Sequence, residues 1–199
     1  MGVARTGGSG KFERMETSQR ANRGPKAAAG NRAALIRAAR ELFAADGFDV
    51  PLSAIARAAG VGQGVLYRHF PTRESIALTV FEENIAEVEA AAANPESTVD
   101  DILAVIVGQL TDSAAFIAVL DPADTEDPRL CEVGRRLFDL TERKLADPDR
   151  RGALRPDIVT GDVMMAVAML GGILSKTPVA TRADAARQAW SLLRRGLHG

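Results

Sequence analysis

Residues 52–70 read LSAIARAAGVGQGVLYRHF, and this stretch decides the fold. Two short apolar segments meet at Gly60, where glycine permits the positive φ that a tight turn requires. Ala56 lies four residues before the turn and is small enough for the two segments to approach closely. Val61 and Leu66 supply the side chains that fill the space between them and fix their crossing angle.

We predict that these segments form short helices over 53–59 and 63–70, joined as a helix-turn-helix. In that arrangement the second helix enters the major groove of DNA by its N-terminal end. The pattern alone is moderately specific, because many short helical hairpins share it.

Apolar residues keep a helical period along the rest of the chain, and no alternating segment is long enough for a strand. Asn31 is a good N-cap for a helix that ends at Asp46, and Thr72 caps a long helix that ends at Ala93. Ser97 and Thr98 each have an aspartate three residues on, which is the capping-box spacing. The other expected helices cover 98–113, a resumption at 114–120, then 129–146, 157–175 and 181–197, the last capped by Thr181. The chain is predicted to be all-α.

The composition is that of a folded domain, with 46% hydrophobic and 26% charged residues among 199. The single cysteine, Cys131, excludes an intramolecular disulfide and a cysteine metal cluster, and two histidines leave little for other metal or base chemistry. The longest apolar run, 163–174, has twelve residues, whereas a bilayer span needs about 20. We therefore expect a cytoplasmic protein with no metal, no cofactor and no membrane segment.

Charge is divided unevenly along the chain. Residues 1–73 carry 12 basic and 5 acidic side chains, whereas residues 74–199 carry 13 basic and 21 acidic ones. A basic front suits a polyanionic partner, although a solvated basic tail has the same composition. Residues 1–30, rich in Gly, Ser and Arg, are expected to form a flexible basic arm.

A longer set of segments makes the prediction specific. AARELF at 38–43, DGF at 46–48, IARAAGV at 55–61 and LYRHFPTRE at 66–74 resemble the N-terminal domain of TetR-family transcriptional regulators. The resemblance covers about residues 32–81, and beyond it only helix number, length and order agree. That family is all-helical and dimeric, and it binds operator DNA until a small molecule in the C-terminal domain releases it.

The resemblance implies a helix-turn-helix DNA-binding domain over 31–76 and a helical bundle over 77–199 for ligand binding and dimerisation. It implies a homodimeric repressor of a palindromic double-stranded operator, answering to a small-molecule effector. Two alternatives stay open: a helical small-molecule-binding or hydrolytic protein whose front hairpin is structural only, and a regulator that answers to a partner protein instead of a ligand.

The sequence departs from the family pattern at the start of the second helix. Gly62 stands where Ser or Thr is usual, Gln63 where a basic residue is usual, and Val65 where Thr is frequent. Pro51 replaces a usual Thr before the first helix of the motif, a position that proline tolerates. We expect fewer phosphate contacts and a different base preference from those of a typical relative.

Gln63 can pair bidentately with adenine, and Val65 can touch a thymine methyl or pack against the preceding helix. Tyr67 is expected on a phosphate from the resemblance, or half-buried instead. His69 either contacts phosphate or closes its helix. The amides after Thr72 can receive a phosphate, and the basic arm can reach the minor groove. The predicted DNA-binding residues are Gln63, Gly64, Val65, Tyr67, Arg68, His69, Thr72, Arg73, Ser53, Arg57, Arg32 and Lys26.

In the rear half, apolar side chains are candidates for an effector pocket, although such a stripe is more often ordinary core. The candidates are Phe116, Phe138, Met164, Met165 and Met169. The last two helices are apolar with little charge, which suits a four-helix dimer seam. The predicted seam residues are Gly171, Gly172, Ala186, Ala189, Trp190, Leu193 and Leu197.

No enzymatic site emerges from the sequence. Glu82–Glu83 and Asp100–Asp101 are adjacent pairs, and neighbours on a helix point apart, so neither pair forms a two-carboxylate site. No phosphate loop, dinucleotide fingerprint or zinc spacing is present. We predict that the protein is not an enzyme.

Overall fold

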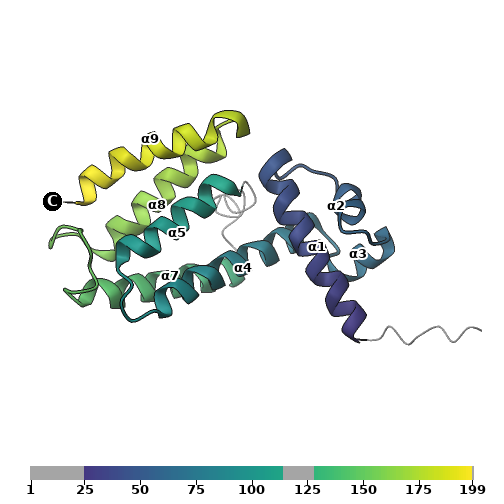
Figure 1. Cartoon of the computed structure of the whole chain (residues 1–199), viewed down its shortest axis with the longest axis horizontal. Helices are drawn as coiled ribbons and strands as arrows, with labels where there is room; N and C mark the ends of the chain where they lie inside the picture. The colour runs from purple at the N-terminus through teal and green to yellow at the C-terminus, as the bar shows by residue number, and fades with distance from the viewer. Residues whose placement is uncertain (1–24, 114–127, 199) are drawn as a thin grey trace, which may run out of the picture.

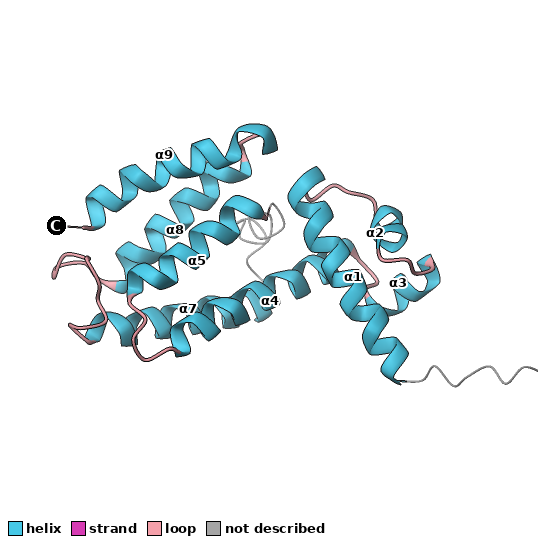
Figure 2. Cartoon of the chain, in the orientation of Figure 1, coloured by secondary structure: helices cyan, strands magenta, loops and turns pink. Residues whose placement is uncertain are grey.

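The computed structural model describes residues 25–113 and 128–198, which form eight helices and no strand (Figure 2). The predicted all-α fold is confirmed for these residues. A single β-bridge joins Leu154 to His198. The helices are α1 Pro25–Asp46, α2 Leu52–Ala58, α3 Gln63–His69, α4 Arg73–Ala93, α5 Val99–Asp112, α7 Pro128–Ala146, α8 Thr160–Ser175 and α9 Val179–Leu197.

Helices α1, α2 and α3 form a compact unit at one end of the molecule, and the remaining helices form a bundle at the other end (Figure 1). The core of the N-terminal unit includes Leu35, Phe43, Ile55 and Leu66, all fully buried. These apolar side chains come from all three helices, so burial of their surface holds the three short elements together.

Helix α4 belongs to both units. Its first turns place Ile76, Ala77 and Val80 in the N-terminal core, whereas Phe81 and Ile85 lie in the core of the bundle. The domain boundary predicted between residues 76 and 77 therefore falls within one unbroken helix.

Polar contacts also tie α4 to its neighbours. Arg40 of α1 reaches two carboxylates of α4, with Nη1 2.7 Å from Glu87 Oε1 and Nη2 3.2 Å from Glu83 Oε2. Gln109 of α5 donates to Glu87 Oε2 at 3.1 Å and to the Asn84 carbonyl at 2.9 Å. These half-exposed pairs each contribute little free energy, but they fix how α1, α4 and α5 meet.

Two predicted helix starts are confirmed by capping contacts. Thr72 Oγ1 accepts a hydrogen bond from Ser75 N at 3.1 Å. Thr98 Oγ1 accepts from Asp101 N at 3.3 Å, while Asp101 Oδ2 accepts from Thr98 N at 2.8 Å. The backbone N–H and hydroxyl of Thr98 lower the pKa of the Asp101 carboxyl, because both stabilise its charged form.

Three other helix starts were predicted wrongly. Helix α1 begins at Pro25, not at Asn31, because proline is preorganised for the first helical position and the alanines that follow favour helix. The last six residues of the predicted arm are thus helical. Helix α8 begins at Thr160 instead of residue 157, since Asp162 Oδ2 accepts from Val159 N at 3.0 Å and satisfies that start.

The third wrong start is that of α9. Pro178 is the N-cap, and Thr181 lies inside the first turn, where its hydroxyl donates to the Pro178 carbonyl at 3.3 Å. Asp184, three residues after Thr181, does not complete a capping box but is ion-paired with Arg187. The predicted helix at 114–120, the acidic loop after it and residues 1–24 of the predicted arm lie outside the described residues.

The C-terminal end of the bundle is closed around one carboxylate. Asp100 Oδ2 accepts a hydrogen bond from Ala153 N at 2.7 Å, and Oδ1 lies 2.8 Å from His198 Nε2. Gly152, next to Ala153, has φ of 74°, a left-handed conformation that favours glycine. A Cβ at this position would overlap Asp100 Oδ2, so the tight approach requires glycine.

We predict that Gly152→Ala lowers the free energy of unfolding by about 1–3 kcal/mol, because it adds backbone strain and pushes Asp100 away. Urea unfolding followed by circular dichroism measures the change. Gly134→Ala is the control: Gly134 is exposed within α7, nothing lies within 4 Å of a Cβ there, and alanine favours helix. Equal stability of Gly152→Ala and the wild type would contradict the prediction.

Candidate nucleic-acid interface

The turn between α2 and α3 has the geometry that the sequence predicts. Gly60 has φ of 68°, and Val61 N donates to the Ala56 carbonyl at 3.0 Å, which closes the end of α2. Ala56 and Leu66 are 1% and 0% exposed and pack between the two helices. The hairpin is therefore held from inside, which leaves the outer face of α3 available.

The outer face of α3 carries polar side chains and open backbone. Gln63, Gly64, Tyr67 and Arg68 are all exposed, and the Tyr67 side chain is 51% exposed despite its size. A Cβ added at Gly64 would meet nothing within 4 Å. This face can approach another surface closely, with a bidentate amide at its N-terminal end and a cation near its C-terminal end.

Two predicted contact residues of α3 lie only partly in the open. Val65 is half-buried. This burial is compatible with the second role considered for Val65, packing against the preceding helix. His69 is also half-buried, and its ring centroid lies 6.3 Å from that of Phe70, which belongs to the core.

The start of α4 brings a further cation to this end of the molecule. Thr72 is exposed, and Arg73 lies with Nη1 3.3 Å from Asp49 Oδ1 and its guanidinium carbon 5.6 Å from the centroid of the Phe48 ring. The Nε of Arg73 is buried without an acceptor in the described part of the chain. Arg73 is thus positioned by its neighbours and keeps donor capacity.

Basic residues of α1 and α2 complete the predicted set. The Arg32 guanidinium carbon lies 5.3 Å from the centroid of the Phe70 ring, so α1 runs beside the end of α3. Arg57 and Lys26 are exposed, and Ser53 is half-buried. Lys26 projects from α1 and not from an arm, since the helix already includes it.

Sequence reasoning missed the place of Asp49. This carboxylate is 99% exposed and pairs with Arg73 across 24 residues of sequence. The sequence spacing of Asp49 and Arg73 does not predict this ion pair, because the loop after α1 brings the two side chains together. Asp49 partly neutralises a predicted phosphate-binding cation.

The candidate effector-pocket residues do not converge on one enclosed cavity. Met165 and Met169 are 62% and 51% exposed on α8, and Phe138 is 40% exposed on α7. Met164 packs against the core at the C-terminal end of the bundle. Consecutive methionines on a helix point in different directions, which is why the stripe does not form one wall. Phe116 lies outside the described residues.

Most of the predicted seam residues face inward. Gly171, Ala186, Ala189 and Leu197 are buried within the protomer itself. Trp190 and Leu193 are half-buried against the bundle cores, and of the seven only Gly172 is exposed. The apolar side chains that α8 and α9 leave outside are different ones: Met165, Met169, Ile173 and Leu192, between 46% and 62% exposed.

Two features are absent from residues 25–113 and 128–198. None of these helices is long and apolar enough to cross a membrane. These ranges also contain no group of three or more His, Cys, Asp and Glu side chains placed to hold a metal ion.

Comparisons with known proteins extend the local resemblance. Residues 35–80 match the family model described as bacterial regulatory proteins of the tetR family. A TetR transcriptional regulator from Streptomyces coelicolor has a similar structure, with 25% identity and a TM-score of 0.57, over 84% of this chain and 98% of that one. No curated protein sequence matches the chain.

Two more solved structures are similar over 86% of this chain and 90% of theirs. One is the TetR family protein CprB from Streptomyces coelicolor in complex with its biological operator sequence, at 24% identity and a TM-score of 0.57. The other is a gamma-butyrolactone receptor described as ArpA-like, at 23% identity and a TM-score of 0.55.

An exposed α3 on a compact helical unit, followed by a helical bundle, defines a helix-turn-helix transcriptional regulator. Residues 35–80 form a DNA-binding domain of the tetR type, as the segments at 38–74 predict, and the whole chain is similar in structure to a TetR transcriptional regulator. The alternative of a helical binding or hydrolytic protein with a merely structural hairpin is not favoured by these matches.

We predict that Leu66→Ala lowers the free energy of unfolding by about 2–5 kcal/mol, because it leaves a cavity between α2 and α3. Thermal and urea unfolding measure the effect. The neighbouring exposed substitution, Tyr67→Ala, should change stability by no more than about 0.5 kcal/mol. If both variants are equally stable, Leu66 does not hold the hairpin.

Proposed function

We propose that this protein is a ligand-responsive repressor that binds a palindromic operator as a homodimer. The observation that carries the proposal is the outer face of α3, where Gln63, Tyr67 and Arg68 are exposed together on a helix whose other side is locked in the core. The operator complex of CprB, a similar structure, supports the same use of this end of the molecule.

In this proposal Gln63 reads a base and the surrounding groups hold the backbone. The Gln63 amide can donate to N7 and accept from the N6 amino group of adenine. Tyr67, Arg68 and Arg73 supply donors to phosphates, and the first amides of α4 add a further anion site after Thr72. The other predicted contacts, Ser53, Arg57, Arg32 and Lys26, flank this surface on α2 and α1.

A palindromic operator requires two copies of α3 related by a two-fold axis, about 34–36 Å apart. The exposed apolar face of α8 and α9 supports the proposed homodimer, because Met165, Met169, Ile173 and Leu192 would otherwise stay in water. Helix α9 lies at the edge of the bundle farthest from α4 (Figure 1). Pairing there would leave both N-terminal units free to face one duplex.

The proposal also includes release of the operator DNA when a small molecule binds. A ligand can change operator affinity only if it binds one conformer more tightly than the other. The similarity to a gamma-butyrolactone receptor supports such regulation without identifying the ligand. The proposal requires no catalytic step, and it places the protein in the cytoplasm, where operator DNA lies.

Selection of bound duplexes from a random library tests the proposal. We expect recovery of one palindromic site, and fluorescence anisotropy then measures affinity for it. Gln63→Ala should cost about 1–3 kcal/mol and alter the preferred sequence, whereas Arg68→Gln should lower affinity for all sequences and reduce the salt dependence.

Glu142→Ala is the control, since Glu142 is exposed on α7 in the bundle. Failure to recover any site, or equal binding by the wild type and the Gln63→Ala and Arg68→Gln variants, would overturn the DNA-binding proposal. Continued operator binding across ligands of many chemical classes would favour a regulator that answers to a partner protein.

We predict that Met169→Glu converts a dimer to a monomer, because a carboxylate would be buried in the seam without a partner. Sedimentation velocity measures the state. Phe138→Glu is the matched control, since Phe138 is 40% exposed on α7, away from the α8–α9 face. Persistence of the dimer in Met169→Glu, or a monomeric wild type, would contradict the proposed seam.

A further inference from the structure

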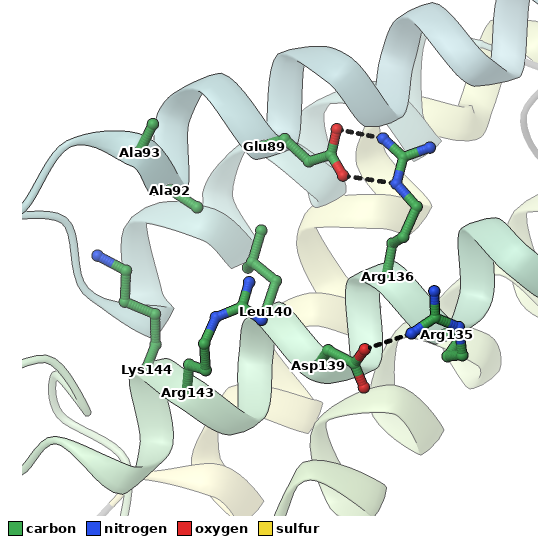
Figure 3. Close-up of a pocket in the computed structure, with 9 residues that line it drawn as sticks. All are labelled: Glu89, Ala92, Ala93, Arg135, Arg136, Asp139, Leu140, Arg143 and Lys144. Atoms are coloured by element: carbon green, nitrogen blue, oxygen red, sulfur yellow. Dashed lines mark hydrogen bonds and ion pairs between the residues drawn. The ribbon is translucent and has the colours of Figure 1, made fainter.

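A groove of about 370 Å³ lies between the last turns of α4 and the second half of α7 (Figure 3). Its volume is within the range of small-molecule sites. Four cationic side chains line it, all from α7, against two carboxylates, Glu89 and Asp139. The groove thus carries an excess of positive charge, whereas residues 74–199 as a whole carry more acidic than basic side chains.

Both carboxylates of the groove are already paired. Glu89 receives two hydrogen bonds from the Arg136 guanidinium, with Nε 2.8 Å from Oε1 and Nη2 on Oε2. Asp139 Oδ2 accepts from Arg135 Nη1 at 2.8 Å. These two pairs lie at one end of the groove (Figure 3).

The other end of the groove holds Arg143 and Lys144. Arg143 has no hydrogen bond or ion pair among the described residues, and its guanidinium points toward α4. Lys144 Nζ donates to the Asn94 carbonyl at 3.1 Å and to Ser97 O and Oγ at 2.9 and 3.0 Å. All three acceptors are uncharged, and the positive charge of Lys144 also helps to lower the pKa of the nearby Asp101 carboxyl.

The floor between the two ends is apolar. Ala92 and Ala93 contribute methyl groups from α4, and Leu140 of α7 is only 7% exposed. Leu140 and Ala92 also pack in the main core of the bundle, so this floor is fixed. The groove therefore offers the Arg143 guanidinium, which is unpaired among the described residues, beside a short apolar surface.

We propose that the α4–α7 groove binds a small amphipathic anion. A carboxylate or phosphate head group pairs with Arg143, and a short apolar body lies on Ala92, Ala93 and Leu140. A guanidinium is a strong donor to such anions. The inference rests on the proposed function, since it assigns the chemical class of the effector.

Isothermal titration of the full-length protein without DNA tests this site. The probes are decanoate and decyl phosphate, which carry the same chain with different head groups. Decanol, which lacks charge, and decyltrimethylammonium, which reverses it, are the comparison compounds. We expect at least one anion to bind at a single site per chain, and the stronger anion identifies the head group.

Two variants locate the site. Arg143→Gln should weaken anion binding about tenfold, the loss of one charge-assisted hydrogen bond. Ala93→Trp should abolish binding by filling the floor while every charge is kept. Arg187→Gln, on exposed α9, is the matched control and should bind as the wild type does. Circular dichroism verifies that each variant is folded.

Absence of binding by both anions overturns the proposal, as does binding that Arg143→Gln and Ala93→Trp leave unchanged. Equal binding of decyltrimethylammonium would indicate adsorption of the chain alone and would overturn it too. Because no DNA is present, these outcomes are independent of operator binding. Anion binding together with failure of the operator selection would retain the site and remove its role as an effector site.

Discussion

Everything in this molecule depends on one helix serving two hydrophobic cores. The first turns of α4 complete the N-terminal core through Ile76 and Val80, and the following turns enter the bundle through Phe81 and Ile85. A helix transmits displacement along its axis because its backbone hydrogen bonds are all internal. The two units therefore cannot change their relative orientation unless α4 tilts, bends or leaves one of its cores.

The contacts that surround α4 explain why its outer face is so acidic. Glu83 and Glu87 meet Arg40 of the N-terminal unit, and Glu89 meets Arg136 of the bundle. A row of glutamates on a helix usually indicates only a solvated surface, yet here the row joins three elements. A ligand in the α4–α7 groove would lie beside the last of these pairs, which joins α4 to α7.

The sequence was sufficient for the parts of the fold that local chemistry determines. Thr72 and Thr98 cap as their spacing predicts, and Gly60 takes the positive φ that the turn requires. It was insufficient wherever a helix is apolar on more than one side. Ala186 and Ala189 form a clear stripe on α9, but periodicity cannot distinguish the protomer's own core from a partner. The sequence also could not predict the groove between α4 and α7 or the Asp49–Arg73 ion pair, because each brings together residues that are distant in sequence.

The start of α3 has two glycines, and both face empty space: a Cβ at Gly62 or Gly64 would meet no atom within 4 Å. Neither glycine has a positive φ, so other residues fit there without backbone strain. New side chains at these two positions would enter open space on either side of Gln63 without touching the core that holds the hairpin. Under the proposed function, substitutions at these two positions would rewrite target preference while the rest of the chain is left as it is, which suits the protein to the engineering of mutually orthogonal regulators.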